Sequence, residues 1–546
     1  MKRNTLLSLT VLGLSLTVFV SHSLAIRHER LVDAWRPLHY SVELTLDDKL
    51  TELVKARTQI EIVAIKRLSV VDFDFGELTT DSVSLDSSTL SFEHEDNKLV
   101  VQLPQSVEPN TKLSLTIVYH GKPKDGLILT TDKDGRPSAV GDNWPDRVHH
   151  WIPCLDHPSA KATVQFKITT PGNDLVVANG RLDHVETTSE GTRTWSYTEA
   201  QPIPPYCMVI GVGQFARIDG SSAITPLSFY VPQSDATYAP TGFAPAAPVL
   251  RVFTETVAPY PYEKLALIIG ATRFGGMENS SAIVFASNLF NSSPSPSVSE
   301  TFGIPAHTVD VVAHEIAHQW FGDSVTEATW SDLWLSEGFA TYFAGVFIQR
   351  QEGETAFRRY MTEAAEKAFA YEKKKRAPIF DPNTENLFDL LNANNYQKGA
   401  WVLHMLRSRL GDDAFFSGIR NYYEAHKTST ATSEDLRSAF ERASAADLKQ
   451  FFQRWVYDSG HPQYELSWDW VKMKRALKVT LKQVQPGNAF LDPVELKITS
   501  ASGSRVVKVE PTGKTFVQTI QLNERPQQVE LDPRNLLLRE IVSGNP

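Results

Sequence analysis

Two histidines and a glutamate stand at the spacing of a catalytic zinc site. His314 and His318 lie four positions apart in the segment His-Glu-Ile-Ala-His, and Glu337 follows after eighteen intervening residues. On a helix, side chains four positions apart project from one face, so both imidazoles can bind a single metal ion. Glu337, on a second helix, would be the third ligand and leave the fourth position to water, whereas a structural zinc site has four protein ligands. The spacing predicts one Zn²⁺ per chain.

Glu315 lies between the two histidines, where a carboxylate can act as the general base of a hydrolytic reaction. Zinc polarises a carbonyl and lowers the pKa of its bound water. Glu315 would accept the proton of that water and deliver it to the leaving amine. Three further acidic residues are alternative third ligands of the metal: Asp323, Glu327 and Asp332.

A second group of residues precedes the histidines: Gly275-Gly276-Met277-Glu278-Asn279, after an apolar segment. Paired glycines let a backbone approach a ligand closely and present its N–H and C=O groups to a peptide. A carboxylate beside them can bind an ammonium group, which makes Glu278 a candidate substrate-binding residue. The alternative is a Gly-Gly turn with an exposed glutamate.

A hydrolytic site also needs a hydrogen-bond donor that faces the oxyanion. Tyr396 is a candidate, although its residue type alone favours a half-buried helical tyrosine. Four histidines are expected to serve packing rather than metal binding: His149, His150, His307 and His404.

Length and composition are those of a multidomain globular protein. A chain of 546 residues is too long for one core, so two to four domains are expected. With 42% apolar and 22% charged residues the composition is that of an ordinary soluble protein. The net charge of −10 comes without a block of like charges, which argues against nucleic acid as a partner.

The first 25 residues have the pattern of a secretory signal peptide. Lys2 and Arg3 precede an apolar run from Leu6 to Val20, and Ser23-Leu24-Ala25 provides a cleavage site. The alternative is an uncleaved membrane anchor, for which the run is short. We expect residues 1–25 to be removed, no stable membrane span afterwards, and export to the periplasm or the extracellular space.

The sequence leaves open whether Cys154 and Cys207, the two cysteines of the chain, form a disulfide. In an oxidising compartment they could pair, and they could equally be buried and inert. The zinc prediction does not depend on them, because the set of two histidines and a glutamate is complete without sulfur.

Strand patterns dominate both ends of the mature chain. Apolar residues alternate or run at strand length between turns, which predicts an N-terminal antiparallel β-domain over residues 26–225. Short strands with turns such as Ser502-Gly503 and Thr512-Gly513 predict a small C-terminal β-sandwich domain over residues 461–546.

Helical periodicity dominates the domain predicted over residues 226–460. It begins with a helix that stops near Pro259, followed by two neighbouring strands, "KLALIIGA" and "SSAIVFAS". Pro305 precedes the helix that carries the two histidines, as a helix start prefers. The segment "TSED" predicts a capping box headed by Thr432 or Ser433.

Four motifs, in order, resemble the zinc aminopeptidases of the aminopeptidase N and leukotriene-A hydrolase family: GGMEN, HEIAHQWFG, WSDLWLSEGFA and YQKGAWVLHML. RPLHY and WIPCLDHPSAKA also match, so the resemblance covers nearly all of the mature chain. It implies a multidomain α+β protein in which a thermolysin-like, mostly helical catalytic domain lies between the two β-domains.

The resemblance also implies roles for single residues. His314, His318 and Glu337 would bind zinc, with Glu315 as general base and Tyr396 as the oxyanion-stabilising residue.

Glu278 resembles the residue that binds the free α-amine of the substrate, and the rest of Gly275–Asn279 would bind the substrate beside it. Because the scissile bond must then follow the first residue, the expected activity is removal of N-terminal residues from peptides.

Three features depart from the family pattern. Relatives carry a Gln or Glu, a second amine-binding residue, about a dozen residues before the position of Asp156, where this chain has Trp144 with Asn143 beside it. Amine binding would rely more on Glu278 or use Asn143. Ser336 replaces an Asn common in relatives. The printed sequence ends after the small β-domain, so the long helical C-terminal domain of many relatives is expected to be absent and the cleft more open.

The sequence thus favours an exported zinc aminopeptidase acting on peptides with a free N-terminus. Two alternatives remain: a thermolysin-like zinc endopeptidase, which would not need GGMEN, and a non-catalytic peptide-binding relative, which would normally have lost a ligand or the base.

Overall fold

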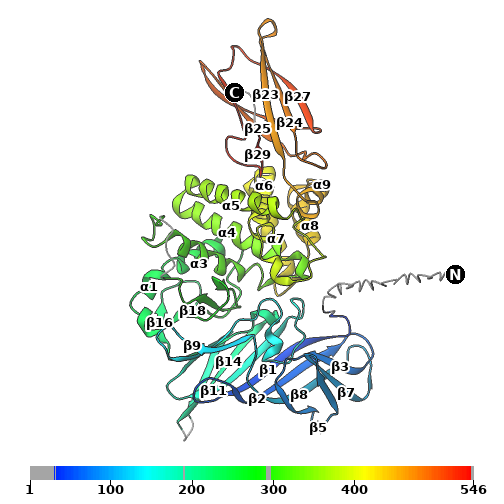
Figure 1. The fold of residues 1–546 in the computed structure, drawn as a ribbon, viewed down its shortest axis with the longest axis vertical. Coiled ribbons are helices and arrows are strands. Elements are labelled where there is room, and N and C mark those ends of the chain that lie inside the picture. Colours follow the sequence, from blue (N-terminus) through cyan, green and yellow to red (C-terminus); the bar gives the residue numbers. More distant parts are fainter. Residues whose placement is uncertain (1–29, 31, 188–190, 291–296, 543–546) are drawn as a thin grey trace, which may run out of the picture.

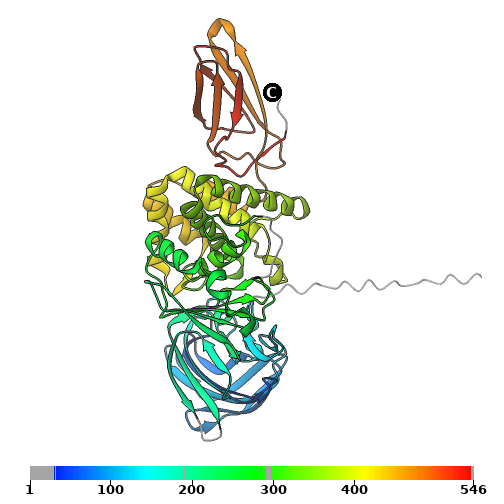
Figure 2. The ribbon, with the colours of Figure 1, turned by 90° about the vertical axis from the view of Figure 1, so that its left-hand side faces the viewer.

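The computed structural model describes residues 30, 32–187, 191–290 and 297–542. The predicted signal peptide, residues 1–25, lies outside the described residues. Figure 1 shows three regions along the long axis: an N-terminal β-region, a mostly helical central region and a C-terminal β-region. Figure 2, turned by 90°, shows the same order, so the regions follow one another end to end. Among the described residues, no helix combines the length and apolar character needed to cross a membrane.

The N-terminal β-region is built on an eight-stranded sheet with the order β13-β14-β11-β1-β2-β8-β4-β5. Its strands are β1 (Trp35–Leu46), β2 (Leu53–Ala64), β4 (Thr79–Leu85), β5 (Ser88–Thr89), β8 (Lys112–Gly121), β11 (Ala162–Pro171), β13 (Arg181–Thr187) and β14 (Thr192–Ile203). Burial alternates along β1, as the pleat of a half-buried strand requires.

One pair of strands departs from the antiparallel arrangement predicted for this region. β1 and β11 run parallel, with His39 opposite Thr163 and Thr45 opposite Thr169. A parallel pair needs a long connection, and here the chain builds most of the region between the two strands before it returns. The other pairs in the sheet are antiparallel.

Two smaller sheets complete the N-terminal region. One has the order β3-β7-β6 and consists of β3 (Leu68–Asp74), β6 (Phe92–Glu95) and β7 (Lys98–Val107). The other has the order β12-β15-β10-β9 and consists of β9 (Leu127–Thr131), β10 (Pro137–Gly141), β12 (Leu175–Ala178) and β15 (Ile210–Gly213). Cys154 and Cys207 are both buried and free, so the structure contains no bridge between them.

The central region starts with a five-stranded sheet of order β16-β17-β18-β20-β19. Its strands are β16 (Ala216–Gly220), β17 (Leu227–Val231), β18 (Leu265–Gly270), β19 (Gly276–Met277) and β20 (Ala282–Ala286). β18 and β20 pair in parallel, which confirms that "KLALIIGA" and "SSAIVFAS" are neighbours. Since β16 pairs with β17, this sheet extends across the predicted boundary between residues 225 and 226.

Helices make up most of the rest of the central region. They are α1 (Ala239–Gly242), α2 (Ala246–Thr256), α3 (Ala306–His318), α4 (Trp334–Glu352), α5 (Glu354–Lys374), α6 (Gly399–Leu410), α7 (Asp412–His426), α8 (Ser433–Ser444) and α9 (Lys449–Phe452). A short parallel ladder joins β21 (Val325–Glu327) to β22 (Ser429–Ala431).

Two local features of the helical part bear on the predictions. Thr432 caps α8 and shares a capping box with Asp435, which settles the choice between Thr432 and Ser433. Tyr396 does not lie in an α-helix: it belongs to a π-helical turn, Asn394–Lys398, that leads into α6.

The C-terminal β-region consists of two sheets, with orders β27-β24-β23-β29 and β26-β25-β28. The strands are β23 (Gln463–Val471), β24 (Ala476–Gln483), β25 (Val494–Ser500), β26 (Gly503–Val509), β27 (Thr515–Gln521), β28 (Gln528–Leu531) and β29 (Glu540–Ile541). Buried residues of both sheets, among them Val479 and Ile498, share one apolar core, as in a small sandwich.

Candidate metal centre and peptide-binding cavity

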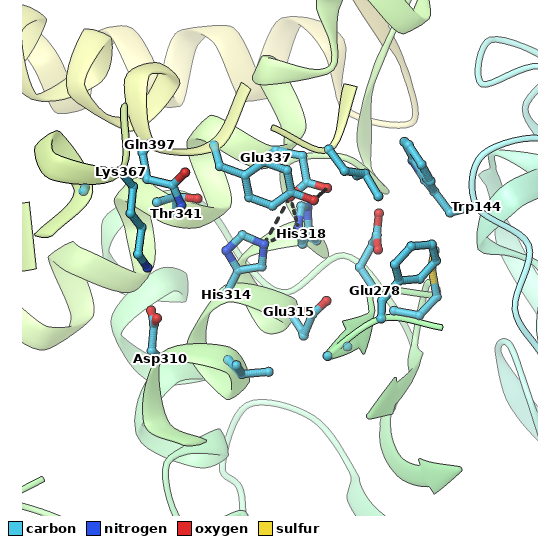
Figure 3. Close-up of a pocket in the computed structure, with 18 of the residues that line it drawn as sticks. Trp144, Glu278, Asp310, His314, Glu315, His318, Glu337, Thr341, Lys367 and Gln397 are labelled. Carbon is cyan, nitrogen blue, oxygen red and sulfur yellow. Dashed lines mark hydrogen bonds and ion pairs between the residues drawn. The ribbon is translucent and has the colours of Figure 1, made fainter. Parts of the chain in front are cut away.

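Three side chains converge at one point between α3 and α4. Nε2 of His314 lies 3.1 Å from Nε2 of His318. Oε2 of Glu337 lies 3.2 Å from Nε2 of His314 and 3.3 Å from Nε2 of His318. Ligands about 2.0–2.2 Å from a tetrahedral zinc ion lie roughly 3.3–3.5 Å from one another. The three donor atoms therefore fit one zinc ion, and Figure 3 shows them facing a common space.

The hydrogen-bond partners of Nδ1 of His318 determine which of its two ring nitrogens can bind metal. Nδ1 of His318 lies 3.1 Å from the carbonyl oxygen of Phe321 and 3.0 Å from Oγ of Ser336. Because a carbonyl oxygen only accepts hydrogen bonds, Nδ1 of His318 carries the proton and donates to Phe321. Nε2 is then unprotonated, and its lone pair faces the space beside Glu337. Ser336, which departs from the family pattern, thus supports a metal ligand.

The three alternative third ligands lie elsewhere. Asp323 accepts hydrogen bonds from Gln319 and the thiol of Cys207. Asp332 accepts from the backbone and the hydroxyl of Ser433. Glu327 is buried and does not belong to either group of potential metal ligands among the described residues. Glu337 is therefore the third member of the cluster.

Glu315 reaches the cavity from α3 because the opposite wall has no side chain. A Cβ atom at Gly276 would overlap the carboxylate of Glu315. Gly276 lies in β19, whose pairing with β20 holds it against α3. Close backbone approach is thus the reason for glycine here. At Gly275, by contrast, a Cβ would meet no atom of the described residues within 4 Å.

The buried carboxyl groups strongly influence one another. Burial is the largest cause that raises the pKa of Glu315 well above its ordinary range; His318 opposes the shift, and Glu278 and Glu337 add to it. Burial would also raise the pKa of Glu337, but the two histidines hold it well below its ordinary range. A divalent cation among these groups would lower the pKa of each carboxyl.

Tyr396 lies directly over the ligands. Its hydroxyl donates to Oε1 of Glu337 at 2.7 Å, and its ring stacks on that of His314 at 5.9 Å between centroids. The close approach depends on glycines: a Cβ at Gly338 of α4 would lie 3.0 Å from backbone atoms of Gly399 at the start of α6. The π-helical turn can therefore pack tightly against α4.

Glu278 and Gln397 lie on opposite sides of His314 (Figure 3). Its side chain is buried, and burial, as the largest cause, raises its pKa to about 7; His318 opposes the shift and Glu337 adds to it. Glu278, Glu315 and His318 place side-chain atoms within 4.8 Å of one another. A cavity of about 350 Å³ connects these groups with His314, Glu337 and Tyr396.

Gln319, to which the sequence assigns no role, ties the segment that carries Glu278 to the end of α3. Its Nε2 donates to the carbonyl of Glu278 at 2.8 Å and to Asp323 at 2.7 Å. Its Oε1 accepts from the backbone of Ser281 at 2.8 Å and from Tyr260 at 3.0 Å. In the sequence, its position immediately after His318 indicates that Gln319 lies near the metal cluster. That position does not reveal its hydrogen-bond partners.

Two expectations about substrate contacts need correction. Asn143 is fully buried, accepts from Trp151 and donates to the carbonyl of Met208, so its amide is not free to bind an amine. Asn279 is fully buried as well, outside the cavity lining, and donates to the carbonyl of Met277. Both side chains satisfy backbone groups behind the wall. Trp144, beside Asn143, lines the cavity instead.

Gly275 also differs in part from its expected role. Its carbonyl accepts the backbone N–H of Ala286 at 3.0 Å, so this oxygen already has a partner within the sheet. The histidines expected to serve packing lie outside the metal cluster. His404, for example, lies among Trp401, Phe357 and Tyr342.

Two family models match the chain. The "Peptidase M1 N-terminal domain" covers residues 36–207, and the "Peptidase family M1 domain" covers residues 245–455, which include every residue of the metal cluster.

Among curated relatives, the chain is 28% identical to "Probable aminopeptidase 1" of Sulfurisphaera tokodaii, over 72% of this chain and 50% of the relative. It is 27% identical to "Leucyl aminopeptidase" of Saccharolobus solfataricus, over 65% of this chain and 44% of the relative. It is 27% identical to "Aminopeptidase M1" of Arabidopsis thaliana, over 78% of this chain and 51% of the relative. The chain spans about half the length of the curated relatives it matches. With both domain models matched in order around this cluster, the chain belongs to the peptidase M1 family.

Proposed function

We propose that this protein is a zinc aminopeptidase that hydrolyses the peptide bond after the N-terminal residue of its substrates. The observation that carries the proposal is the position of Glu278, a buried carboxylate in the same cavity as the metal cluster and Glu315. The names of relatives in archaea and plants, all aminopeptidases, support the same activity.

The donor set fits zinc, because two imidazole nitrogens and one carboxylate oxygen converge at tetrahedral spacing. Zinc held by His314, His318 and Glu337 would polarise the scissile carbonyl and lower the pKa of a water molecule. We infer that the central region is a thermolysin-like catalytic domain, supported by the two histidines on α3 and the glutamate on α4.

Three residues of the chain carry out the remaining steps: Glu315, Tyr396 and Glu278. Glu315 accepts the proton of the attacking water on its carboxylate and passes it to the nitrogen of the leaving amine. The Tyr396 hydroxyl lines the same cavity and donates to Glu337 in the structure, and it would stabilise the developing oxyanion. The Glu278 carboxylate binds the ammonium group of the substrate, so that the first peptide bond lies at the metal centre.

Comparison of free and blocked peptides tests this proposal. The zinc-loaded protein should hydrolyse a leucyl peptide and leave its N-acetylated form intact, because acetylation removes the charge that Glu278 binds. Elemental analysis should give one zinc per chain, and a chelator should abolish activity. Cleavage of the acetylated peptide at a similar rate would favour an endopeptidase, and a metal-free protein that binds peptides without turnover would favour a non-catalytic relative.

We also propose export to the periplasm or the extracellular space, supported by the charged, apolar and small-residue pattern of residues 1–25. N-terminal sequencing of the protein from its native host should find a start near Ile26. Recovery of the protein with Met1 in place, inside the cell, would contradict export.

A further inference from the structure

The cavity at the metal centre has two chemically different ends. In Figure 3, Asp310 and Lys367 lie on one side of His314, whereas Glu278 and Trp144 lie on the other. The proposed function orients a substrate in this space. With the ammonium group at Glu278 and the scissile bond at the metal, the leaving chain extends toward Asp310 and Lys367, and the first side chain faces the Trp144 end.

The Trp144 end is apolar. Four lining residues carry no charge there: Trp144, Phe274, Met277 and Leu391. Trp144 and Met277 belong to one buried apolar cluster, and Phe274 and Leu391 pack against it. This cluster lies where the N-terminal β-region meets the central sheet, so the two regions form this end of the cavity together.

Trp144 is held in place by its ring neighbours and by its backbone. Its ring makes edge-to-face contacts with Phe274, Trp330 and Phe388, with centroid distances of 5.9, 5.7 and 5.7 Å. Nε of Arg147 donates to the carbonyl oxygen of Trp144 at 2.8 Å. Trp144 is 2% exposed, and its Nε1 has no hydrogen-bond partner among the described residues.

A small polar network fixes Arg147 and links it to the substrate-binding segment. Arg147 pairs with Asp142 at 3.0 Å and with Asp125 at 2.7 Å. Asp142 is fully buried and accepts from Thr272 at 3.0 Å, two residues before Phe274. The same network therefore positions Trp144 and the start of the segment that carries Glu278. A side chain with such fixed neighbours is a rigid wall rather than an adaptable one.

We propose that Trp144 is a specificity-determining residue and that the protein prefers substrates with a large apolar N-terminal residue, such as leucine, methionine or phenylalanine. This inference rests on the proposed function for the orientation of the substrate. A large apolar side chain gains by leaving water for the wall of Trp144, Phe274, Met277 and Leu391. Alanine leaves part of that wall uncovered. Among the described residues that line the cavity beside Trp144, the charged one is Glu278, and the ammonium group of the substrate occupies it.

Aminoacyl fluorogenic substrates test the preference. For the wild type, kcat/KM should be at least about tenfold higher with leucine or phenylalanine than with alanine, and lowest with glutamate. Trp144→Ala should lower the leucine-to-alanine ratio about tenfold. Trp144→Phe should keep the apolar preference and, because the ring is smaller, raise the phenylalanine-to-leucine ratio.

Trp195→Phe is the matched control for Trp144→Phe, because Trp195 packs in the core of the N-terminal region and does not line the cavity. Its substrate ratios should equal those of the wild type. The inference is overturned if the wild type accepts alanine or glutamate as well as leucine. It is also overturned if neither Trp144 variant changes any ratio.

A binding measurement separates failure of this inference from failure of the proposed function. In a zinc-loaded Glu315→Gln background, calorimetry should show leucyl-alanine binding at least about tenfold more tightly than alanyl-alanine, and Trp144→Ala should remove most of that difference. If no free peptide is hydrolysed by the wild type yet this difference persists, the activity proposal fails and the binding preference stands. Equal affinities would overturn the preference whatever the activity.

Discussion

The carboxylate of Glu315 occupies the space that a side chain at position 276 would need. Gly276→Ala should therefore displace the proposed general base while leaving the metal ligands in place. A displacement on the order of 1 Å can cost about 100-fold in rate. We expect kcat to fall by about that factor, with zinc content unchanged by elemental analysis.

The neighbouring glycine provides the control for this prediction. Gly275→Ala adds a Cβ with no atom within 4 Å in the part of the chain that the structure describes, so kcat should stay within about twofold of wild type. Equal losses in the two variants would mean that chain flexibility in the segment, rather than room for Glu315, is what matters.

Removing the charge of Glu278 should separate substrate binding from metal binding. Glu278→Gln keeps the shape of the side chain but leaves the ammonium group of the substrate without its buried partner. Loss of such a pair costs about 2–5 kcal/mol, so kcat/KM should fall by about 30-fold or more. Zinc content should stay at one per chain. Glu363→Gln changes an exposed residue of the same cavity and is the control; it should have little effect on kcat/KM. Unchanged kinetics in Glu278→Gln would contradict the amine-binding role of Glu278.

At the scale of single residues, the sequence was most informative where local spacing sets the chemistry. His314, His318 and Glu315 lie on one helix, so their relation follows from helix geometry. The side-chain partners of Asn143 and Gln319 depend on contacts between distant segments, such as Gln319 with Glu278. No spacing in the chain predicts those contacts.

Among the helices, the crossing of α4 with the start of α6 sets the position of Tyr396. Gly399→Ala would place a Cβ 3.0 Å from Cα of Gly338 and 3.5 Å from Cβ of Trp334. The helices must then separate, which should cost about 1–3 kcal/mol in the free energy of unfolding, as overpacking does. Tyr396 should move away from Glu337 with its turn, so kcat should fall as well.

Chemical denaturation and steady-state kinetics check the two parts of this prediction together. Gly513→Ala, in a turn where a Cβ meets no atom within 4 Å, is the control and should change neither quantity. A Gly399→Ala variant that loses stability but keeps full kcat would show that Tyr396 does not depend on the crossing.

Elements were predictable where their periodicity is regular and local. α3 and α8 begin where the sequence indicates, because Pro305 directly precedes α3 and the capping box of Thr432 directly precedes α8. The parallel pairing of β1 with β11 joins strands separated by most of the N-terminal region, and alternation along a strand does not reveal its partner. The π-helical turn at Tyr396 likewise follows from packing against Gly338 rather than from periodicity.

Over the whole molecule, buried charges connect the central region to its neighbours. From the N-terminal region, Nζ of Lys161 donates to the carbonyls of Asp323 and Ser324 at 2.7 and 2.8 Å, in the segment that follows the metal helix. Toward the C-terminal region, Glu372 of α5 accepts from Lys398 at 2.9 Å and bonds to His461, which also lies 3.1 Å from Glu540 of β29. Both contacts hold a β-region against elements close to the metal cluster.

The contact at Glu372 makes the stability of the protein depend on pH in a defined direction. Burial alone would raise the pKa of Glu372, but the hydrogen bond from His461 and the charge of Lys398 outweigh it and lower the pKa from 4.5 to about 2. Between these values the folded protein binds fewer protons at this site than the unfolded chain does. The stabilisation is therefore complete above about pH 5 and is lost as the pH falls toward 2, by about 3 kcal/mol in total.

Glu372→Gln should remove this dependence together with the charge. Near neutral pH the variant should unfold more easily by about 3–5 kcal/mol, because Lys398 stays buried without its partner. The difference in unfolding free energy between wild type and variant, measured in urea from pH 6 to pH 3, should shrink steadily below pH 5. Glu366→Gln, an exposed change on the same helix, should show no such trend. A difference for Glu372→Gln that stays constant down to pH 3 would mean that this carboxylate does not hold the two regions together through its charge.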